Sequence, residues 1–228
     1  MSKIVLTEEQ KSIVEDSGSP LRVLAGPGTG KTLCIIEKVV RLINEQKVSP
    51  KTISVITFTK ATAAELRDRL ERAGIKPDLL PHANTLHGFA MSILKSHQGR
   101  THLKPNFQPV HAIMQRIIVK DTTEDLKHIG VKLGRAEPKS YMHACQQKKS
   151  KAGIPCHLSE SAHKEKIFEQ FTQAYHENLR FYNAIDWADI LALVIELMEN
   201  HGDIRKEVHA KTSHLLVDDD LPPENCTA

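Results

Sequence analysis

Eight residues near the start of the chain combine glycine, lysine and threonine in a pattern that suits phosphate binding. They are Ala25, Gly26, Pro27, Gly28, Thr29, Gly30, Lys31 and Thr32. Glycines let backbone N–H groups approach phosphate oxygens closely, and the dipole of a following helix favours negative charge there. Lys31 at the helix start would neutralise the β- and γ-phosphates, and the Thr32 hydroxyl would bind Mg²⁺. These residues predict a site for a nucleoside triphosphate and Mg²⁺.

To bind phosphate in this way, the loop must connect the end of a strand to the start of a helix. Leu21–Ala25 is the apolar run expected to form the strand, and the helix expected to follow has a broad apolar face through Ile43. The eight residues match the P-loop pattern, except that Ala25 replaces the first glycine. A plain glycine-rich turn is the alternative, and it does not account for Gly-Lys-Thr at a helix start.

Short apolar runs alternate with helical patterns through the first hundred residues. A second strand is expected at Ile53–Thr57, where four of five residues are β-branched. A helix is expected from about Ala61 to Ala73, then a short run at Ala83–Leu86 and another helix at His87–Lys95. This alternation predicts βαβ units and a parallel sheet.

The character of the sequence changes near Gln98. Polar and basic segments there surround helical patterns at about 110–119, 164–179 and 188–198, which indicates a mostly helical insertion. His214–Val217 is then expected to be a buried strand, and it runs into three aspartates. We therefore expect the first part of the sheet domain at 1–97, the helical insertion at 98–210, and a return to the sheet domain at 211–228 with a frayed end.

Three further segments complete a recognisable order of motifs. Leu6–Gln10 lies about fifteen residues before the loop, Phe58–Arg69 follows the second strand, and Asn84–Phe89 begins the next helix. Together with the P-loop, the insertion and the strand that ends in aspartates, they resemble the motifs of UvrD/Rep-type superfamily 1 DNA helicases over nearly the full chain. The resemblance implies an α/β fold, a P-loop NTPase (RecA-like) parallel sheet with a mostly helical inserted subdomain.

The resemblance also implies that Gln10 reads the adenine of ATP. A glutamine amide can donate and accept hydrogen bonds at adenine N6 and N7 together. Without the P-loop, a surface position near a helix that Thr7 begins would be the preferred interpretation of Gln10. The expected nucleotide-binding set is therefore Gln10 with residues 25–32.

Five residues are expected to contact single-stranded DNA by the same resemblance. Phe58 would stack on a base, which contributes about 1–3 kcal/mol whatever the base. Thr59 and Lys60 would contact phosphate, although the residues after Thr59 depart from the family's Asn-Lys-Ala. Thr85 and His87 would contact phosphate or sugar. The alternatives are a core position for Phe58 and a helix cap or packed residue for His87.

The strand that ends in aspartates stands where the family has its Walker B motif. The resemblance implies that Asp218 binds Mg²⁺ with Thr32. It also implies that Lys31, Asp218 and Asp219 are the catalytic residues, with Asp219 orienting or deprotonating the attacking water. Asp219 replaces the family's glutamate, so its carboxylate lies nearer the backbone by about 1.5 Å. A misplacement of about 1 Å can lower a rate by roughly 10²-fold. An acidic turn is the alternative for Asp219.

The function expected from the resemblance is that of an ATP-binding portion of an ATP-dependent DNA helicase, which couples ATP hydrolysis to translocation on single-stranded DNA. ATP and Mg²⁺ are the expected cofactors. Single-stranded DNA and a second RecA-like domain missing from these 228 residues are the expected partners. The chain alone is expected to be inactive. The alternatives are another P-loop ATPase, or a truncated fragment that binds nucleotide or DNA without catalysis.

Composition says little about which partner the protein binds, and somewhat more about where in the cell it is expected. The net charge of +3, from 31 basic and 28 acidic residues, permits a polyanionic partner without requiring one. Four scattered cysteines cannot supply a disulfide framework, and no stretch approaches the ~20 apolar residues of a membrane span, so a cytoplasmic protein without a membrane partner is expected. The lysine-rich stretch at 139–166 is equally compatible with a solvated face and a DNA-facing one. Cys145, Cys156, His157 and His163 do not have the spacing of a structural zinc site.

Overall fold

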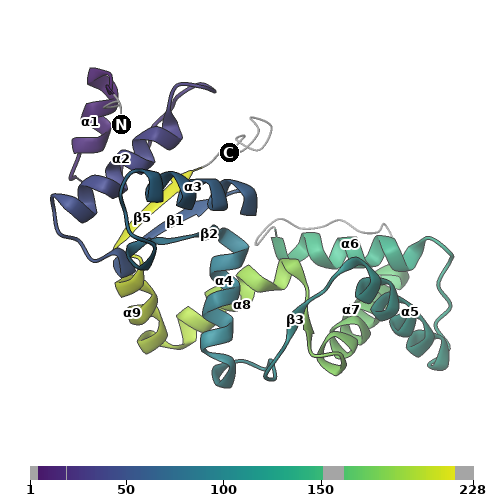
Figure 1. The fold of residues 1–228 in the computed structure, drawn as a ribbon. Coiled ribbons are helices and arrows are strands. Elements are labelled where there is room, and N and C mark those ends of the chain that lie inside the picture. Colours follow the sequence, from purple (N-terminus) through teal and green to yellow (C-terminus); the bar gives the residue numbers. More distant parts are fainter. Residues whose placement is uncertain (1–4, 19, 151–161, 219–228) are drawn as a thin grey trace. The chain divides into compact units, whose positions relative to one another are not determined.

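The protein is described by a computed structural model that covers residues 5–18, 20–150 and 162–218 (Figure 1). The chain divides into two compact units, Met1–Phe89 with Asp203–Ala228, and Ala90–Gly202. The expected insertion, 98–210, begins and ends eight residues later than the second unit. Each boundary falls within or beside a helix, α4 (Leu86–Ser96) or α9 (Gly202–Lys211). Apolar periodicity in the sequence shows that a segment is a helix, but it does not show which of two cores the helix packs against. The sequence therefore could not place the domain boundaries to within a few residues.

A three-stranded parallel sheet forms the centre of the first unit. Its order is β2 (His82–Thr85), β1 (Ile53–Thr57) and β5 (His214–Asp218). The register pairs Thr57 with Thr85 on one side and with Asp218 on the other, so the three strands end level with one another. The predicted α/β class with a parallel sheet is confirmed. Ligands of such folds bind at the carboxyl ends of the strands, and that edge carries most of the candidate site.

Helices surround this sheet and close its core. The helices and short 3-10 turns wholly within the unit are α1 (Glu8–Glu15), α2 (Lys31–Asn44), η1 (Pro50–Thr52), α3 (Lys60–Arg72) and η2 (Pro77–Leu79), and α9 belongs to the unit from its second residue, Asp203, onward. All five residues of β1 are buried. Ile53 and Val55 of β1 share a core with the apolar faces of α2 and α3. The buried members of this cluster are Ile36, Val39, Leu42, Ile53, Val55, Leu66, Leu70, Ile75 and Ala83. The sheet and the P-loop helix are therefore held by one continuous core.

The strand expected at Leu21–Ala25 is absent from the described structure, and that prediction is wrong. Residues 21–25 have no strand assignment and are exposed, with Leu24 at 82%. A hollow of about 560 Å³ is lined by Leu21 and Val23 on one side and by β5 on the other. A strand requires backbone hydrogen bonds to a neighbour, and the hollow separates this segment from the open edge of β5. Strand β5 forms as expected, but the prediction that it is buried is wrong: Leu215 and Val217 are 55% and 58% exposed, because β5 is the edge strand beside this hollow.

The second unit is mostly helical. Its elements, beyond the rest of α4, are η3 (Gln98–Arg100), β3 (Gln108–Pro109), α5 (Ala112–His128), α6 (Glu137–Ser150), α7 (Ala162–Phe181), β4 (Ala184–Ile185) and α8 (Trp187–Asn200). The three expected helical patterns fall in α5, α7 and α8. Helices α6 and α9 were not predicted, because both are polar and have weak apolar periodicity. Strands β3 and β4 pair in parallel over two residues, too few to leave a pattern in the sequence.

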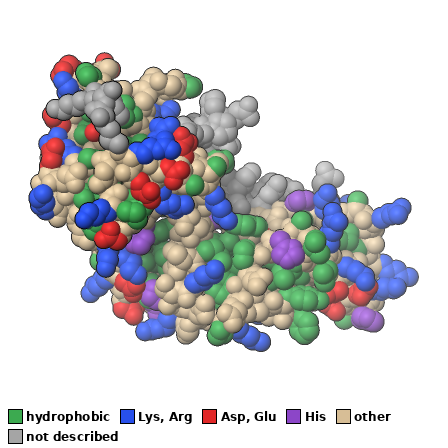
Figure 2. Space-filling model, viewed as in Figure 1, with side chains coloured by type: hydrophobic (Ala, Val, Ile, Leu, Met, Phe, Trp, Pro, Cys, Tyr) green, Lys and Arg blue, Asp and Glu red, His purple; other side chains and the backbone are tan. Residues whose placement is uncertain are grey.

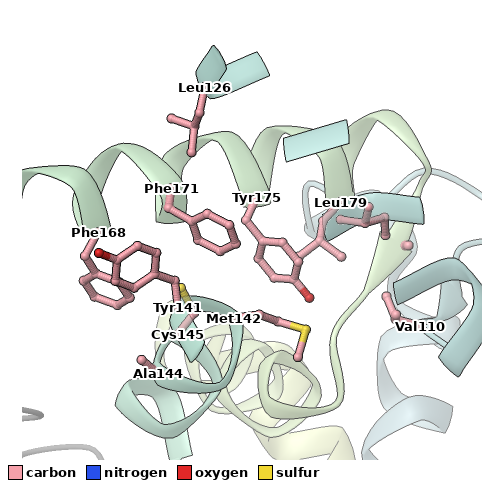
Figure 3. Packing of buried hydrophobic residues seen from close by; sticks show 12 residues of the cluster. Val110, Leu126, Tyr141, Met142, Ala144, Cys145, Phe168, Phe171, Tyr175 and Leu179 are labelled. Atoms are coloured by element: carbon pink, nitrogen blue, oxygen red, sulfur yellow. The ribbon is translucent and has the colours of Figure 1, made fainter. Parts of the chain in front are cut away.

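A row of large side chains on α7, three of them aromatic, packs into the core of the second unit. Phe168, Phe171, Tyr175 and Leu179 follow the spacing of one helical face, and all four are buried. Figure 3 shows them pointing toward side chains of α6, among them Tyr141. The Tyr141 ring centroid lies 5.7 Å from those of both Phe168 and Phe171, a separation at which aromatic pairs attract. This packing fixes α6 against α7.

Candidate functional site

The P-loop residues form an exposed turn that leads directly into α2. Gly28 and Gly30 have φ angles of +76° and +91°, in the left-handed region that favours glycine. At Gly30 a Cβ would also lie 2.8 Å from Gln10 Nε2, so a side chain there would displace the Gln10 amide. The Thr29 hydroxyl donates to the Gly26 carbonyl at 2.8 Å and closes the turn. The predicted loop therefore has the backbone that its glycines imply, and helix α2 begins at Lys31 as expected.

Lys31 lies at the first position of α2 and reaches back across the loop. Its ammonium donates to the carbonyl of Ala25 at 3.1 Å, six residues earlier. The contact holds the ammonium beside the turn that Gly26–Gly30 form, where a phosphate group would bind through backbone N–H groups. Lys31 is half-buried, so its charge is partly shielded from bulk water.

The next residue, Thr32, contacts the end of the sheet. Its hydroxyl donates to Asp218 Oδ2 at 3.1 Å, and Asp218 is only 3% exposed. Hydroxyl and carboxylate oxygens are hard ligands of the kind that Mg²⁺ prefers. The structure therefore brings the two expected metal ligands together. Asp219, the second expected catalytic carboxylate, lies outside the described residues, as does the frayed end expected after it.

Gln10 lies against the P-loop, although it stands fifteen positions before Ala25 in the sequence. It is the third residue of α1 and forms a capping box with Thr7: Gln10 Oε1 accepts from the Thr7 N–H at 3.0 Å, and the Thr7 hydroxyl accepts from the Gln10 N–H at 3.2 Å. Gln10 Nε2 donates to the Thr29 carbonyl at 3.0 Å. One side chain thus begins α1 and ties that helix to the glycine-rich turn.

The DNA-contact candidates on β1 and α3 follow the carboxyl end of the sheet. Phe58 comes directly after Thr57 and is 61% exposed, so it is not the core residue that the alternative interpretation required. Thr59 caps α3 by accepting from the Thr62 N–H at 3.0 Å, and Lys60 is the exposed first residue of that helix. Thr59 therefore has a structural role at this helix start, whereas Phe58 and Lys60 lie open to solvent.

The second pair of DNA-contact candidates begins α4. The Thr85 hydroxyl accepts from the Gly88 N–H at 3.1 Å, and Asn84 Oδ1 accepts from the Thr85 N–H at 2.8 Å. A Cβ at Gly88 would overlap the Asn84 side chain, so a larger residue there would displace the amide that accepts from the Thr85 N–H. Thr85, rather than His87, is the residue that caps this helix. His87 is half-buried and engaged in interactions of its own.

Surface charge adds little to the case for nucleic acid. Figure 2 shows cationic and anionic side chains interspersed over the visible face of the first unit, without a single basic patch. Part of the lysine-rich stretch, residues 151–161, lies outside the described residues, and this part includes Cys156 and His157.

Within the described part of the chain, no group of three histidine, cysteine, aspartate or glutamate side chains is placed so that it could bind a metal ion. Nor does that part contain a helix long and apolar enough to cross a membrane.

Two sets of side-chain hydrogen bonds that the structure shows were not predicted from the sequence. Lys38 on α2 donates to backbone carbonyls at the end of α1, including that of Val14 at 3.0 Å. In the second unit, the buried carboxylate of Asp186 accepts from Gln146 Nε2 at 3.0 and 2.9 Å and from the Tyr175 hydroxyl at 3.0 Å. Both are contacts between residues more than ten positions apart, for which a single sequence offers no local signal.

Comparison with known proteins agrees with this geometry. A sequence model of the UvrD/REP helicase N-terminal domain matches residues 6–220. The chain belongs to the UvrD/REP helicase family. The match runs from the capping box of α1 to the aspartates after β5, so it includes every element of the candidate site in the first unit and the whole helical unit.

Individual UvrD/REP relatives are similar over most of this chain. The ATP-dependent DNA helicase PcrA of Staphylococcus aureus is 25% identical over 218 residues, which cover 94% of this chain and 29% of the relative. The ATP-dependent DNA helicase Rep of Buchnera aphidicola is 28% identical over 215 residues, 94% of this chain and 33% of the relative. The chain thus spans about a third or less of the length of these curated relatives.

Proposed function

We propose that this chain is the ATP-binding portion of an ATP-dependent DNA helicase that couples ATP hydrolysis to translocation on single-stranded DNA. The observation that carries the proposal is the contact between Thr32 and Asp218, which joins the P-loop helix to the end of β5. A glycine-rich turn alone does not require an acidic strand end beside it. A nucleotide site needs both, because the triphosphate and its metal ion bind between them.

Mg²⁺ fits the residues at this edge. Asp218 is buried, and among the described side chains Thr32 is a hydroxyl within hydrogen-bonding distance of it. These two oxygens would hold the ion, which when bound neutralises charge on the β- and γ-phosphates. Lys31 would supply a second positive charge from the helix start. Family membership and the ATP-dependent relatives support this assignment.

The remainder of the nucleotide would lie toward α1. In the proposal, Gln10 faces adenine and the turn at residues 25–30 binds phosphate. The capping box and the bond from Gln10 to the Thr29 carbonyl support this arrangement, since they hold the amide beside the turn. A different P-loop ATPase would not need a glutamine at this distance from the loop.

Single-stranded DNA would bind along the carboxyl edge, where Phe58 is exposed and Lys60 follows it. Thr59, Thr85 and His87 belong to the proposed contact set, although the hydroxyls of Thr59 and Thr85 already cap helices. Translocation would use a second RecA-like domain as partner. By itself the 228-residue chain is expected to bind ATP without sustained hydrolysis or unwinding, because an arginine finger from a partner can contribute about 10³–10⁵ in rate.

Calorimetric titration of the chain with Mg-ATP tests the proposal. We expect wild-type protein to bind and Lys31→Ala to lose at least roughly tenfold in affinity, since about 1.4 kcal/mol of charge-assisted phosphate contact corresponds to that factor. Lys51→Ala is the matched control, because Lys51 is an exposed lysine of the same unit, outside the site. Equal affinities of Lys31→Ala and Lys51→Ala, both folded by circular dichroism, would contradict the P-loop assignment.

A further inference from the structure

Helix α1 has little apolar attachment of its own. It is eight residues long, and Val14 is its buried residue. Isolated helices of this length are marginal in water, so contacts with neighbouring elements must hold it in place. The last carbonyls of any helix also lack partners within the helix.

Lys38 of α2 supplies partners for those carbonyls. Its ammonium donates to the Val14 carbonyl at 3.0 Å, to the Ile13 carbonyl at 3.5 Å and to the carbonyl of Asp16, which ends the helix. A cation at a helix C-terminus is also favoured by the helix dipole. Burial lowers the pKa of Lys38, so the ammonium is partly desolvated where it meets these carbonyls.

A second cation on the same face of α2, Arg41, also lies near the end of α1. Arg41 Nη1 lies 3.4 Å from Glu15 Oε1, one helical turn after Lys38. The Glu15 side chain is 63% exposed, and ion pairs of this kind contribute little. Lys38 is therefore the main polar attachment at the C-terminal end of α1.

The N-terminal end of α1 is attached through Gln10, whose Nε2 donates to the Thr29 carbonyl. The orientation of Gln10 thus depends on where α1 lies, and the position of α1 depends on Lys38. We propose that Lys38 is a positioning residue for base recognition: it holds α1 on the P-loop helix so that Gln10 faces adenine. This inference rests on the proposed function.

The test compares two ligands, Mg-ATP and Mg-tripolyphosphate, by calorimetry on the full chain. Tripolyphosphate occupies the P-loop without a base, so it reports the phosphate site alone. Lys38→Met keeps the apolar stem and removes the donors. We expect Lys38→Met to lose roughly tenfold in affinity for Mg-ATP, the loss expected if one hydrogen bond to the base is forfeited, with tripolyphosphate affinity unchanged.

Three further variants make the result specific. Gln10→Ala should show the same loss as Lys38→Met, and the double variant should lose no more than either, because the two residues act on one contact. Lys38→Arg should restore ATP affinity, since a guanidinium can donate to the same carbonyls. Lys51→Met is the matched control, an exposed lysine of the same unit.

The outcomes separate this inference from the proposed function. An ATP affinity of Lys38→Met equal to that of the wild type would overturn the positioning role. So would equal losses for both ligands, which would place the effect on the P-loop or on folding. If wild-type protein binds neither ligand, the proposed function itself fails, and the inference with it.

Discussion

Thr32 Oγ1 lies 3.1 Å from Asp218 Oδ2, although 186 positions separate the two residues. Thr32 is the second residue of α2, and Asp218 is the last residue of β5, whose Cα partner on β1 is Thr57. The hydrogen bond therefore connects the start of α2 with the end of the sheet, although the whole second unit lies between the two residues in the sequence. Since Asp218 is almost completely buried, its carboxylate depends on such contacts for its hydrogen bonds.

Replacing Thr32 by valine tests the role of this contact in metal binding. Valine keeps the branched shape and removes the hydroxyl. We expect Thr32→Val to lower the affinity for Mg-ATP roughly tenfold, because one ligand of the ion is lost. ATP titrated in the presence of EDTA should bind the wild type and the variant alike. Calorimetry with and without Mg²⁺ measures both affinities.

Thr32→Ser is the control, because serine keeps the hydroxyl and should retain Mg-dependent binding. Thr32→Val should also lower the free energy of unfolding by about 1–3 kcal/mol, since a buried acceptor on Asp218 loses a donor. A loss of ATP affinity that is the same with and without Mg²⁺ would show that Thr32 acts on the loop rather than on the ion.

The parts of the site that the sequence predicted are those with local signals. Gly26–Thr32 can be recognised because positive φ angles require glycine and because the helix begins at Lys31. The strand before Asp218 was recognised from a short apolar run. Its predicted role beside Thr32 came from the order of motifs, since nothing local connects residues so far apart.

The parts that could not be predicted depend on distant partners. Leu21–Ala25 has the composition of a strand, yet it forms one only if a neighbour pairs with it, and β5 lies across a hollow. Lys38 looks like any lysine on an amphipathic helix, and its carbonyl partners lie more than twenty positions away. The exposure of Phe58 was expected only from the resemblance, because large aromatic residues are highly buried on average and the residue alone favoured a core position.

Phe58→Ala should weaken binding of single-stranded DNA without affecting ATP. Stacking of one base contributes about 1–3 kcal/mol, so a loss of roughly 5- to 150-fold in affinity is expected. Because Phe58 is 61% exposed, the thermal midpoint should change little. Fluorescence anisotropy with a labelled oligothymidine at low salt measures the DNA affinity.

Phe58→Trp is the control for stacking, since it keeps an aromatic face and should retain DNA binding. Binding by both proteins should weaken as salt is added, because phosphate contacts release counterions. Should Phe58→Ala unfold the protein, or should it bind DNA as tightly as the wild type, the assignment of Phe58 as a base platform is wrong.

Tyr175→Phe should destabilise the second unit in a pH-dependent way. The Tyr175 hydroxyl donates to the buried Asp186 carboxylate at 3.0 Å, and burial, together with that negative charge, raises the pKa of Tyr175 well above its ordinary value. At neutral pH the variant should lose about 1–3 kcal/mol of unfolding free energy, because Asp186 loses one donor. Urea unfolding measures this loss, followed by fluorescence of Trp187, the single tryptophan and the neighbour of Asp186.

The sign of the pH effect follows from the raised pKa of Tyr175. Unfolded protein releases the phenolic proton near pH about 10, whereas folded protein retains it to higher pH. The stability that Tyr175 contributes is therefore complete below pH about 10 and is lost as the pH rises above it. The difference in unfolding free energy between wild type and Tyr175→Phe should accordingly shrink in alkaline solution.

Tyr182→Phe is the matched control, because the Tyr182 hydroxyl donates to Asp121 at a less buried position, and its removal should have a smaller effect. Equal losses for the two variants, or a difference that does not change with pH, would contradict the role of the Tyr175–Asp186 contact.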